Sequence, residues 1–117
     1  MPTFDIFSRE PDIRSFNSGD PIFREGDPGD CMFVVIEGTV EIRANGVVID
    51  RLSPGGIFGE MGLIDSRPRS AAAMAATDCK LAAIGEKRFL RLVEQTPSFA
   101  LQIMRVISER LRRNSGH

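Results

Sequence analysis

The sequence predicts a mainly β fold, a compact roll or barrel of jelly-roll type, with helices after it. Short apolar or alternating runs, each typical of a strand, follow one another from residue 13 to residue 84, separated by turns rich in glycine, proline and aspartate. From residue 86 onward, apolar side chains recur at helical spacing instead. A chain of 117 residues has room for one core, so we expect one domain over residues 1–117.

The first half of the roll begins after a short N-terminal segment. Residues 1–10 are expected to form a helical turn, and residues 11–85 to form the roll. The pattern over residues 13–23 is strand-like but is interrupted by Ser18-Gly19-Asp20-Pro21. Residues 26–30 are so dense in turn-forming residues that they predict a surface loop. Their acids lack the ligand alternation and the closing glutamate of an EF-hand, which excludes that type of calcium site.

The middle of the chain gives the clearest strand signals. Met32 to Ile36 is a continuous apolar run, typical of a buried strand, and residues 39–43 alternate as a half-exposed strand does. Asn45-Gly46, just before the apolar Val47 to Ile49, predicts a hairpin with a type I′ turn. Two further strands are expected, at residues 70–75 and 80–84.

Two helices are expected over residues 86–113. The first covers residues 86–94, and Thr96-Pro97 supplies an N-cap and a proline that open the second. The apolar surface of the second helix is wider than one face, because Leu101, Met104, Ile107 and Leu111 adjoin the side that holds Phe99, Ile103 and Val106. Arginines crowd its end, where cations suit the helix dipole. The simplest interpretation of these arginines is a solvated helix end. The alternatives are that they form a lid over a ligand or a docking site for an acidic partner.

Composition excludes several function classes. A formal net charge of −1 gives no general attraction to nucleic acid or to an anionic membrane. No basic leader precedes an apolar run, and no apolar stretch approaches the ~20 residues that cross a bilayer, so a cytoplasmic location is expected. Cys31 and Cys79 are too few for a disulfide framework and are expected to be small buried residues in strands. Because the one histidine is His117, no catalytic residue, metal site or cofactor is predicted.

The stretch from Gly55 to Ala73 is the part of the chain that looks built for a ligand. Its four glycines allow tight turns and close approach to backbone N–H donors. A short helix is expected from Gly59 to Ile64, and the N-terminus of such a helix suits an anion. Pro68 favours an extended chain, with a strand from about Arg69, whose guanidinium would reach back over the helix N-terminus.

Glu60 is unexpected beside an anion site. A carboxylate there is unfavourable unless it accepts a hydrogen bond from a hydroxyl of the ligand. A site that combines donors for an anion with a carboxylate for a hydroxyl indicates a ribose phosphate as the ligand. The alternative is a glycine-rich surface turn in which Glu60 and Arg69 are solvated charges.

These residues closely resemble the phosphate-binding cassette of cyclic nucleotide-binding domains. The resemblance lies in Phe58-Gly59-Glu60-Met61-Gly62-Leu63-Ile64, followed by Arg67-Pro68-Arg69-Ser70-Ala71-Ala72. Such domains occur in regulatory subunits of protein kinase A, in catabolite-activator-type regulators and in cyclic-nucleotide-gated channels. The resemblance implies an eight-stranded β-roll that contains the cassette helix, with the cassette at residues 55–73, followed by two C-terminal helices.

The resemblance also assigns roles to residues. Glu60 would take the ribose 2′-hydroxyl and Arg69 the cyclic phosphate, whereas Arg67 falls outside the pattern and is read as a solvated charge. Other residues expected at the phosphate, as backbone donors or close neighbours, are Gly59, Gly62, Leu63 and Ser70. Candidates to contact the base, each with ordinary core packing as its alternative, are Ile42, Ile49 and Leu52.

The function expected from this resemblance is a regulatory binding module, not an enzyme. Its ligand would be cAMP or cGMP, with cAMP favoured although Ser70 offers a hydroxyl that suits either, and its C-terminal helices would repack on binding. The alternative is a degenerate, ligand-free roll that serves as a dimerisation or interaction scaffold. A cupin-like metalloenzyme lacks the histidines it needs. Because no helix-turn-helix follows the long helix, we expect an isolated sensor module, acting in trans or cut from a larger protein, without nucleic acid or membrane insertion. Its protein partner would be a second copy, bound weakly through the C-terminal helix, or a separate effector.

Overall fold

The structure is a computed structural model that describes residue 7, residues 9–65 and residues 67–114. Most of the expected N-terminal helical turn therefore lies outside the described residues. The chain divides into two compact units, one up to Gly85 and one from Glu86 onward.

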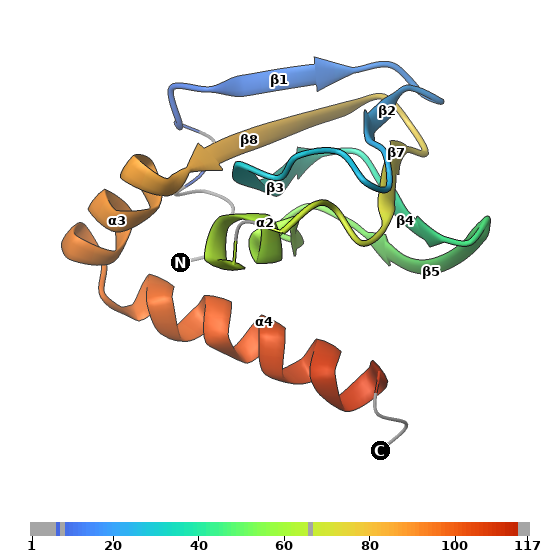
Figure 1. The fold of residues 1–117 in the computed structure, drawn as a ribbon. Helices are drawn as coiled ribbons and strands as arrows, with labels where there is room; N and C mark the ends of the chain where they lie inside the picture. Colours follow the sequence, from blue (N-terminus) through green and yellow to red (C-terminus); the bar gives the residue numbers. More distant parts are fainter. Residues whose placement is uncertain (1–6, 8, 66, 115–117) are drawn as a thin grey trace. The chain divides into compact units, whose positions relative to one another are not determined.

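The first unit contains two four-stranded antiparallel sheets, which confirms the expected eight-stranded β-roll for the described part of the chain. Figure 1 shows β1 and β8 of one sheet side by side. The first sheet has the order β1 (Ile13–Phe16), β8 (Cys79–Gly85), β3 (Cys31–Glu37), β6 (Ile57–Phe58). The second has the order β2 (Pro21–Phe23), β7 (Ala72–Ala75), β4 (Val40–Ala44), β5 (Val47–Leu52).

The core draws side chains from both sheets. In β3, the residues from Cys31 to Val35 are all buried, as their continuous apolar run predicts. Cys31 and Cys79 are free and buried, which confirms their expected role as small core residues. The core cluster of the roll consists of Cys31, Phe33, Val35, Val40, Phe58, Ala73, Ala75, Cys79, Leu81 and Ala83.

Two turns depend on backbone conformations that L side chains rarely adopt. Asn45 and Gly46 both have positive φ, 53° and 77°, which confirms the hairpin that joins β4 to β5. Gly38 has φ of 89°, and a Cβ there would collide with the backbone oxygen of Asp78. The turn between β3 and β4 therefore requires glycine for its conformation and for the space.

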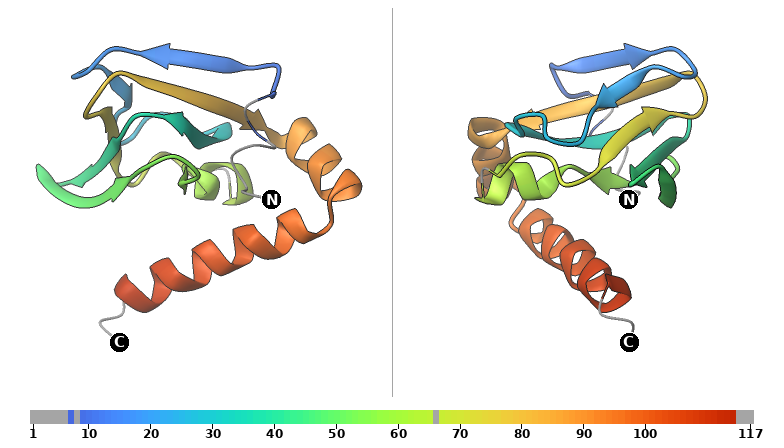
Figure 2. Two further views of the ribbon diagram at one scale, coloured as in Figure 1. Left: turned by 180° about the vertical axis from the view of Figure 1, so that it is seen from behind. Right: turned by 45° about the vertical axis from the view of Figure 1, so that its right-hand side comes forward.

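The strand expected from about Arg69 begins later, at Ala72. Arg69 instead pairs with the loop at residues 26–30: its N–H donates to the oxygen of Asp27 and its oxygen accepts from Gly26, each at 2.8 Å. This loop takes the backbone bonds that a sheet neighbour would have made. Between α2 (Glu60–Asp65) and β7, the chain runs as the connecting loop that Figure 2 shows, and Arg69 lies in this connection.

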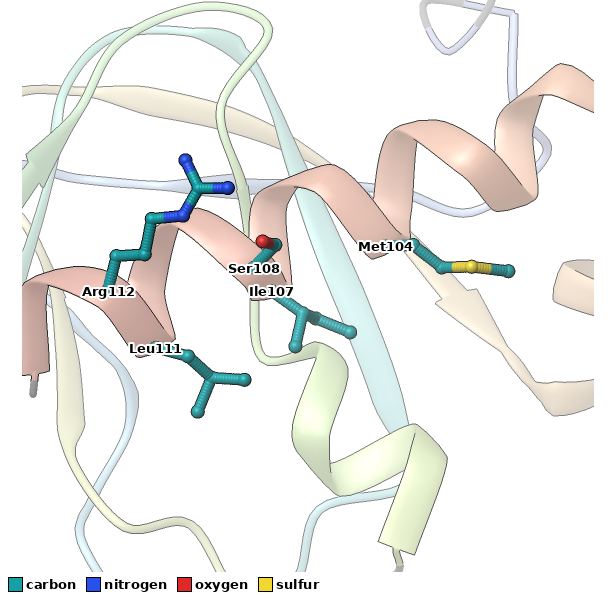
Figure 3. Close-up of a pocket in the computed structure, with 5 residues that line it drawn as sticks. All are labelled: Met104, Ile107, Ser108, Leu111 and Arg112. Carbon is teal, nitrogen blue, oxygen red and sulfur yellow. The ribbon is translucent and has the colours of Figure 1, made fainter.

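The second unit consists of α3 (Glu86–Gln95) and α4 (Ser98–Asn114), as expected apart from one-residue shifts at their ends. Phe89 and Phe99 pack with their ring centroids 5.4 Å apart. Leu101, Met104 and Leu111 are about half exposed or more and are called the exposed α4 face. Figure 3 shows Ile107 and Leu111 pointing to the same side of α4, with Arg112 extending away from them. Among the described residues, no helix combines the length and apolarity needed to cross a membrane.

Candidate functional site

Arg69 is the centre of the candidate site. Only 7% of its surface is exposed, although it is a charged residue on a loop. Its Nη1 donates to the backbone oxygen of Gly59 and its Nη2 to the backbone oxygen of Cys31, both at 2.7 Å. These short, charge-assisted bonds fix the end of the guanidinium between β3 and the residue that precedes α2.

Two phenylalanines lie against the guanidinium. The Cζ atom of Arg69 is 4.3 Å from the ring centroid of Phe23 in β2 and 5.9 Å from that of Phe33 in β3. Both distances are within the range of cation–π attraction, and Phe23 makes the closer contact. A guanidinium that stacks on an aromatic face keeps its edge open for hydrogen bonds.

Glycines surround the same group because no side chain would fit. A Cβ added to Gly59 would lie 2.7 Å from Nη1, and one added to Gly62 would lie 2.9 Å from it. A Cβ added to Gly29 would lie 3.1 Å from Nε. The distances at Gly59 and Gly62 are shorter than Cβ atoms in proteins allow, and Gly59 also has a positive φ of 75°. The glycines at these positions therefore make room for the arginine.

The Nε atom of Arg69 is buried and has no hydrogen-bond partner among the described residues. A buried donor without an acceptor costs ~1–3 kcal/mol, and more when the group is charged. The two carbonyls take one of the two N–H donors on each of Nη1 and Nη2, so three of the five guanidinium donors, that of Nε among them, have no bond among the described residues.

Glu60 lies beside this group as the first residue of α2, directly after Gly59. Only 3% of its surface is exposed, so it is not the solvated charge of the alternative interpretation. Among the other expected phosphate neighbours, Gly62 is buried, Leu63 is half-buried and Ser70 is exposed. Arg67, which falls outside the cassette pattern, has a side chain that is 83% exposed and pairs with Asp65 at 3.8 Å.

The three candidate base contacts do not all lie on one face. Ile42 and Leu52 pack against the core cluster from the inner face of their sheet. The register pairs Ile42 with Asp50 and Arg43 with Val48, so Ile49 is the extra residue of a β-bulge, and it is 56% exposed. Asp50 lies directly opposite Ile42 and so shares its face.

Sequence reasoning missed three residues that hold Arg69: Phe23, Gly29 and Cys31. Cys31 acts here through its backbone oxygen, and burial together with the nearby Asp30 raises the pKa of its thiol, which favours the protonated form. The turn-forming residues at 26–30 predict a surface loop and say nothing of its distant neighbours. The acidic, glycine-containing pattern of this loop also resembles the turn that the family carries ahead of its third strand, and this resemblance is the signal that could have placed it beside the cassette.

Comparison with known proteins identifies the family. Residues 13–96 match the family model described as the cyclic nucleotide-binding domain. The chain belongs to this family. The Cyclic AMP receptor protein of Thermus thermophilus is 34% identical to this domain over an alignment of 104 positions, which covers 85% of this chain and 48% of that protein. The domain thus spans about half the length of this curated relative.

Solved structures agree on the fold. The crystal structure of Thermus thermophilus Catabolite Activator Protein superposes with a TM-score of 0.82 at 34% identity, covering 89% of this chain and 51% of that one. The EAL enzyme Bd1971 has been solved in a cAMP-bound and a cGMP-bound form. These have TM-scores of 0.67 and 0.68, respectively, at 34% identity, and each comparison covers 90% of this chain and 29% of Bd1971.

Proposed function

We propose that this domain binds a cyclic nucleotide, with cAMP preferred to cGMP, and acts as a regulatory sensor and not as an enzyme. The observation that carries the proposal is the buried Nε of Arg69, a charged donor without a partner among the described residues. A cyclic phosphate carries one negative charge and exocyclic oxygens that accept hydrogen bonds. One of these oxygens would satisfy Nε and neutralise the guanidinium charge.

Glu60 gives the site its preference for a sugar phosphate. Buried carboxylates accept hydrogen bonds, and a ribose 2′-hydroxyl would be one donor to this nearly fully buried group. The residue follows Gly59, whose oxygen already binds Nη1, so one short segment would serve both the phosphate arginine and the sugar. The backbone around Gly59, Gly62 and Leu63, and the hydroxyl of Ser70, would complete the phosphate contacts, as in the family.

The base would lie along the inner face of the second sheet. Ile42 and Leu52 offer apolar contacts there, whereas the exposed Ile49 is the weakest of the three candidates. Ser70 follows Arg69, at a position where threonine often accompanies cGMP recognition in the family; serine occurs there in cAMP-selective members, although its hydroxyl suits either nucleotide. Bd1971 has been solved with each nucleotide, so the fold by itself does not select one.

The regulatory step would be a change in the second unit. A ligand shifts a conformational equilibrium only as far as its affinities for the two states differ. Helix α4 follows α3 after a connection of two residues, Thr96 and Pro97, and its exposed α4 face gives it apolar surface that could exchange neighbours. On ligand binding, α3 and α4 are expected to repack. The repacked helices would then bind an effector protein or a second copy of the domain.

Calorimetric titration with cAMP and cGMP in parallel tests the proposal. We expect both to bind, with cAMP the tighter, and Arg67→Ala to behave as the parent because its side chain is exposed. Tighter binding of cGMP would overturn the selectivity alone. If neither nucleotide binds at high micromolar concentration, the proposed function is wrong, and the ligand-free interaction scaffold remains as the alternative.

A further inference from the structure

We propose that Phe23 is a positioning residue for ligand capture: its ring fixes the plane of the Arg69 guanidinium so that the Nε edge faces the phosphate. The effect on ligand affinity rests on the proposed function. The placement of the arginine does not, because it is a property of the domain without ligand.

The contact between the two side chains is close. The guanidinium carbon lies 4.3 Å from the ring centroid, well within the ~6 Å limit for cation–π attraction. The two carbonyl bonds of Arg69 fix two nitrogens, but the plane of the group can still tilt about the line that joins them, as far as rotation in the side chain up to Nε allows. The ring face removes this freedom, because the guanidinium lies against it.

The ring itself is held by the core. Phe23 is 6.1 Å from Phe33 and 6.0 Å from Phe58, centroid to centroid, and those two rings stack on each other at 5.3 Å. Both partners are nearly fully buried, at 3% and 2% exposure. In the second sheet, β2 pairs Phe23 with Ala73, four residues after Arg69. The Phe23 ring is therefore held by residues of both sheets. A side chain of similar volume without a π face would fill the same space but would not attract the guanidinium.

The first test is a double-mutant cycle on cAMP affinity, measured by calorimetry. Phe23→Met keeps a side chain that fills irregular space but removes the aromatic face. We expect it to weaken cAMP binding about fivefold to thirtyfold, which corresponds to ~1–2 kcal/mol. In an Arg69→Ala background the same change should weaken binding less than about twofold, since the group that it positions is gone. Equal losses in both backgrounds would overturn the proposal.

A matched control separates positioning from packing. Phe16 is also partly buried against the core cluster, but among the described residues the rings in cation–π contact with Arg69 are those of Phe23 and Phe33. Phe16→Met should lower thermal stability as Phe23→Met does and leave cAMP affinity within about twofold of the parent. If Phe16→Met weakens binding as much as Phe23→Met, the effect is general softening of the core and the proposal is wrong.

A second readout needs no ligand. Because the Cζ atom of Arg69, to which Nε is bonded, lies 4.3 Å from the ring centroid of Phe23, the NMR resonance of the Nε proton should be shifted upfield by the ring current. It should disappear in Arg69→Lys, which assigns it. In Phe23→Met the shift should be lost while the other arginine resonances stay in place. An Nε resonance that does not respond to Phe23→Met overturns the proposal. A lost shift in a domain that binds neither nucleotide supports the contact between the Phe23 ring and the guanidinium and refutes the proposed function instead.

Discussion

Replacement of Arg69 should damage binding more than any other single change in the roll. Arg69→Ala removes a buried cation that would pair with the phosphate, and truncating one partner of such a pair costs ~2–5 kcal/mol. Because ~1.4 kcal/mol is a factor of ten, affinity for cAMP should fall about thirtyfold to several thousandfold. Arg69→Lys should recover only part of this loss. One ammonium cannot serve the Gly59 and Cys31 carbonyls with the arginine's geometry and also replace Nε.

The same change should also destabilise the domain without ligand. The oxygens of Gly59 and Cys31 lose charge-assisted donors, so Tm should fall even in the absence of nucleotide. Titrations are therefore run well below the Tm of each variant, with Arg67→Ala as the control. Affinity of Arg69→Ala within threefold of the parent would refute the reasoning. A large loss of cAMP affinity in Arg67→Ala would also refute it, because Arg67 and not Arg69 would then be the phosphate arginine.

Four further outcomes are expected. Glu60→Ala should weaken cAMP binding by ~1.5–3 kcal/mol, the value of a hydrogen bond to a charged group. The loss should nearly vanish with 2′-deoxy-cAMP; equal losses with both ligands would show that Glu60 does not contact the sugar. At ~100 times its dissociation constant, cAMP should stabilise the domain by ~2.7 kcal/mol and raise Tm by several degrees, and a melting curve unmoved by millimolar cAMP and cGMP contradicts the assignment. Gly38→Ala should lower the free energy of unfolding, measured in urea, by more than ~2 kcal/mol. Gly19 also has a positive φ but open space around it, so Gly19→Ala should lower it by less. Equal losses would show that the clash at Gly38 does not contribute. The exposed α4 face should give weak dimers in sedimentation at tens of micromolar, and a strict monomer with and without nucleotide would refute that contact.

Local signals predicted most of the roll. Asn45-Gly46 predicts a turn with two positive φ angles, and the structure has 53° and 77° there. The apolar run in β3 predicts a buried strand for the same local reason. Where the sequence misled, a distant segment decided the outcome: the loop at residues 26–30 binds the backbone of Arg69 and delays β7 until Ala72. The two-residue strand β6 is too short to show any periodicity.

The candidate site was predictable in part. Arg69 and Glu60 follow from the cassette pattern, because both act within one short stretch of chain. Phe23 and Cys31 did not follow from it, because they meet Arg69 only after two sheets assemble, across 46 and 38 residues of sequence respectively. Ile49 is the weakest of the assignments made by resemblance: it adjoins Asp50, which shares the face of Ile42, so strand alternation directs Ile49 to the opposite side, where it is 56% exposed.

A crystal structure of the domain grown with cAMP tests the central claim most directly. The account predicts a phosphate oxygen within hydrogen-bond distance of the Arg69 Nε, ~2.7–3.2 Å, with the Glu60 carboxylate on the ribose 2′-hydroxyl. The bonds from Arg69 to the Gly59 and Cys31 oxygens should remain in place. A nucleotide bound elsewhere, or one whose phosphate leaves Nε without a partner, would contradict it.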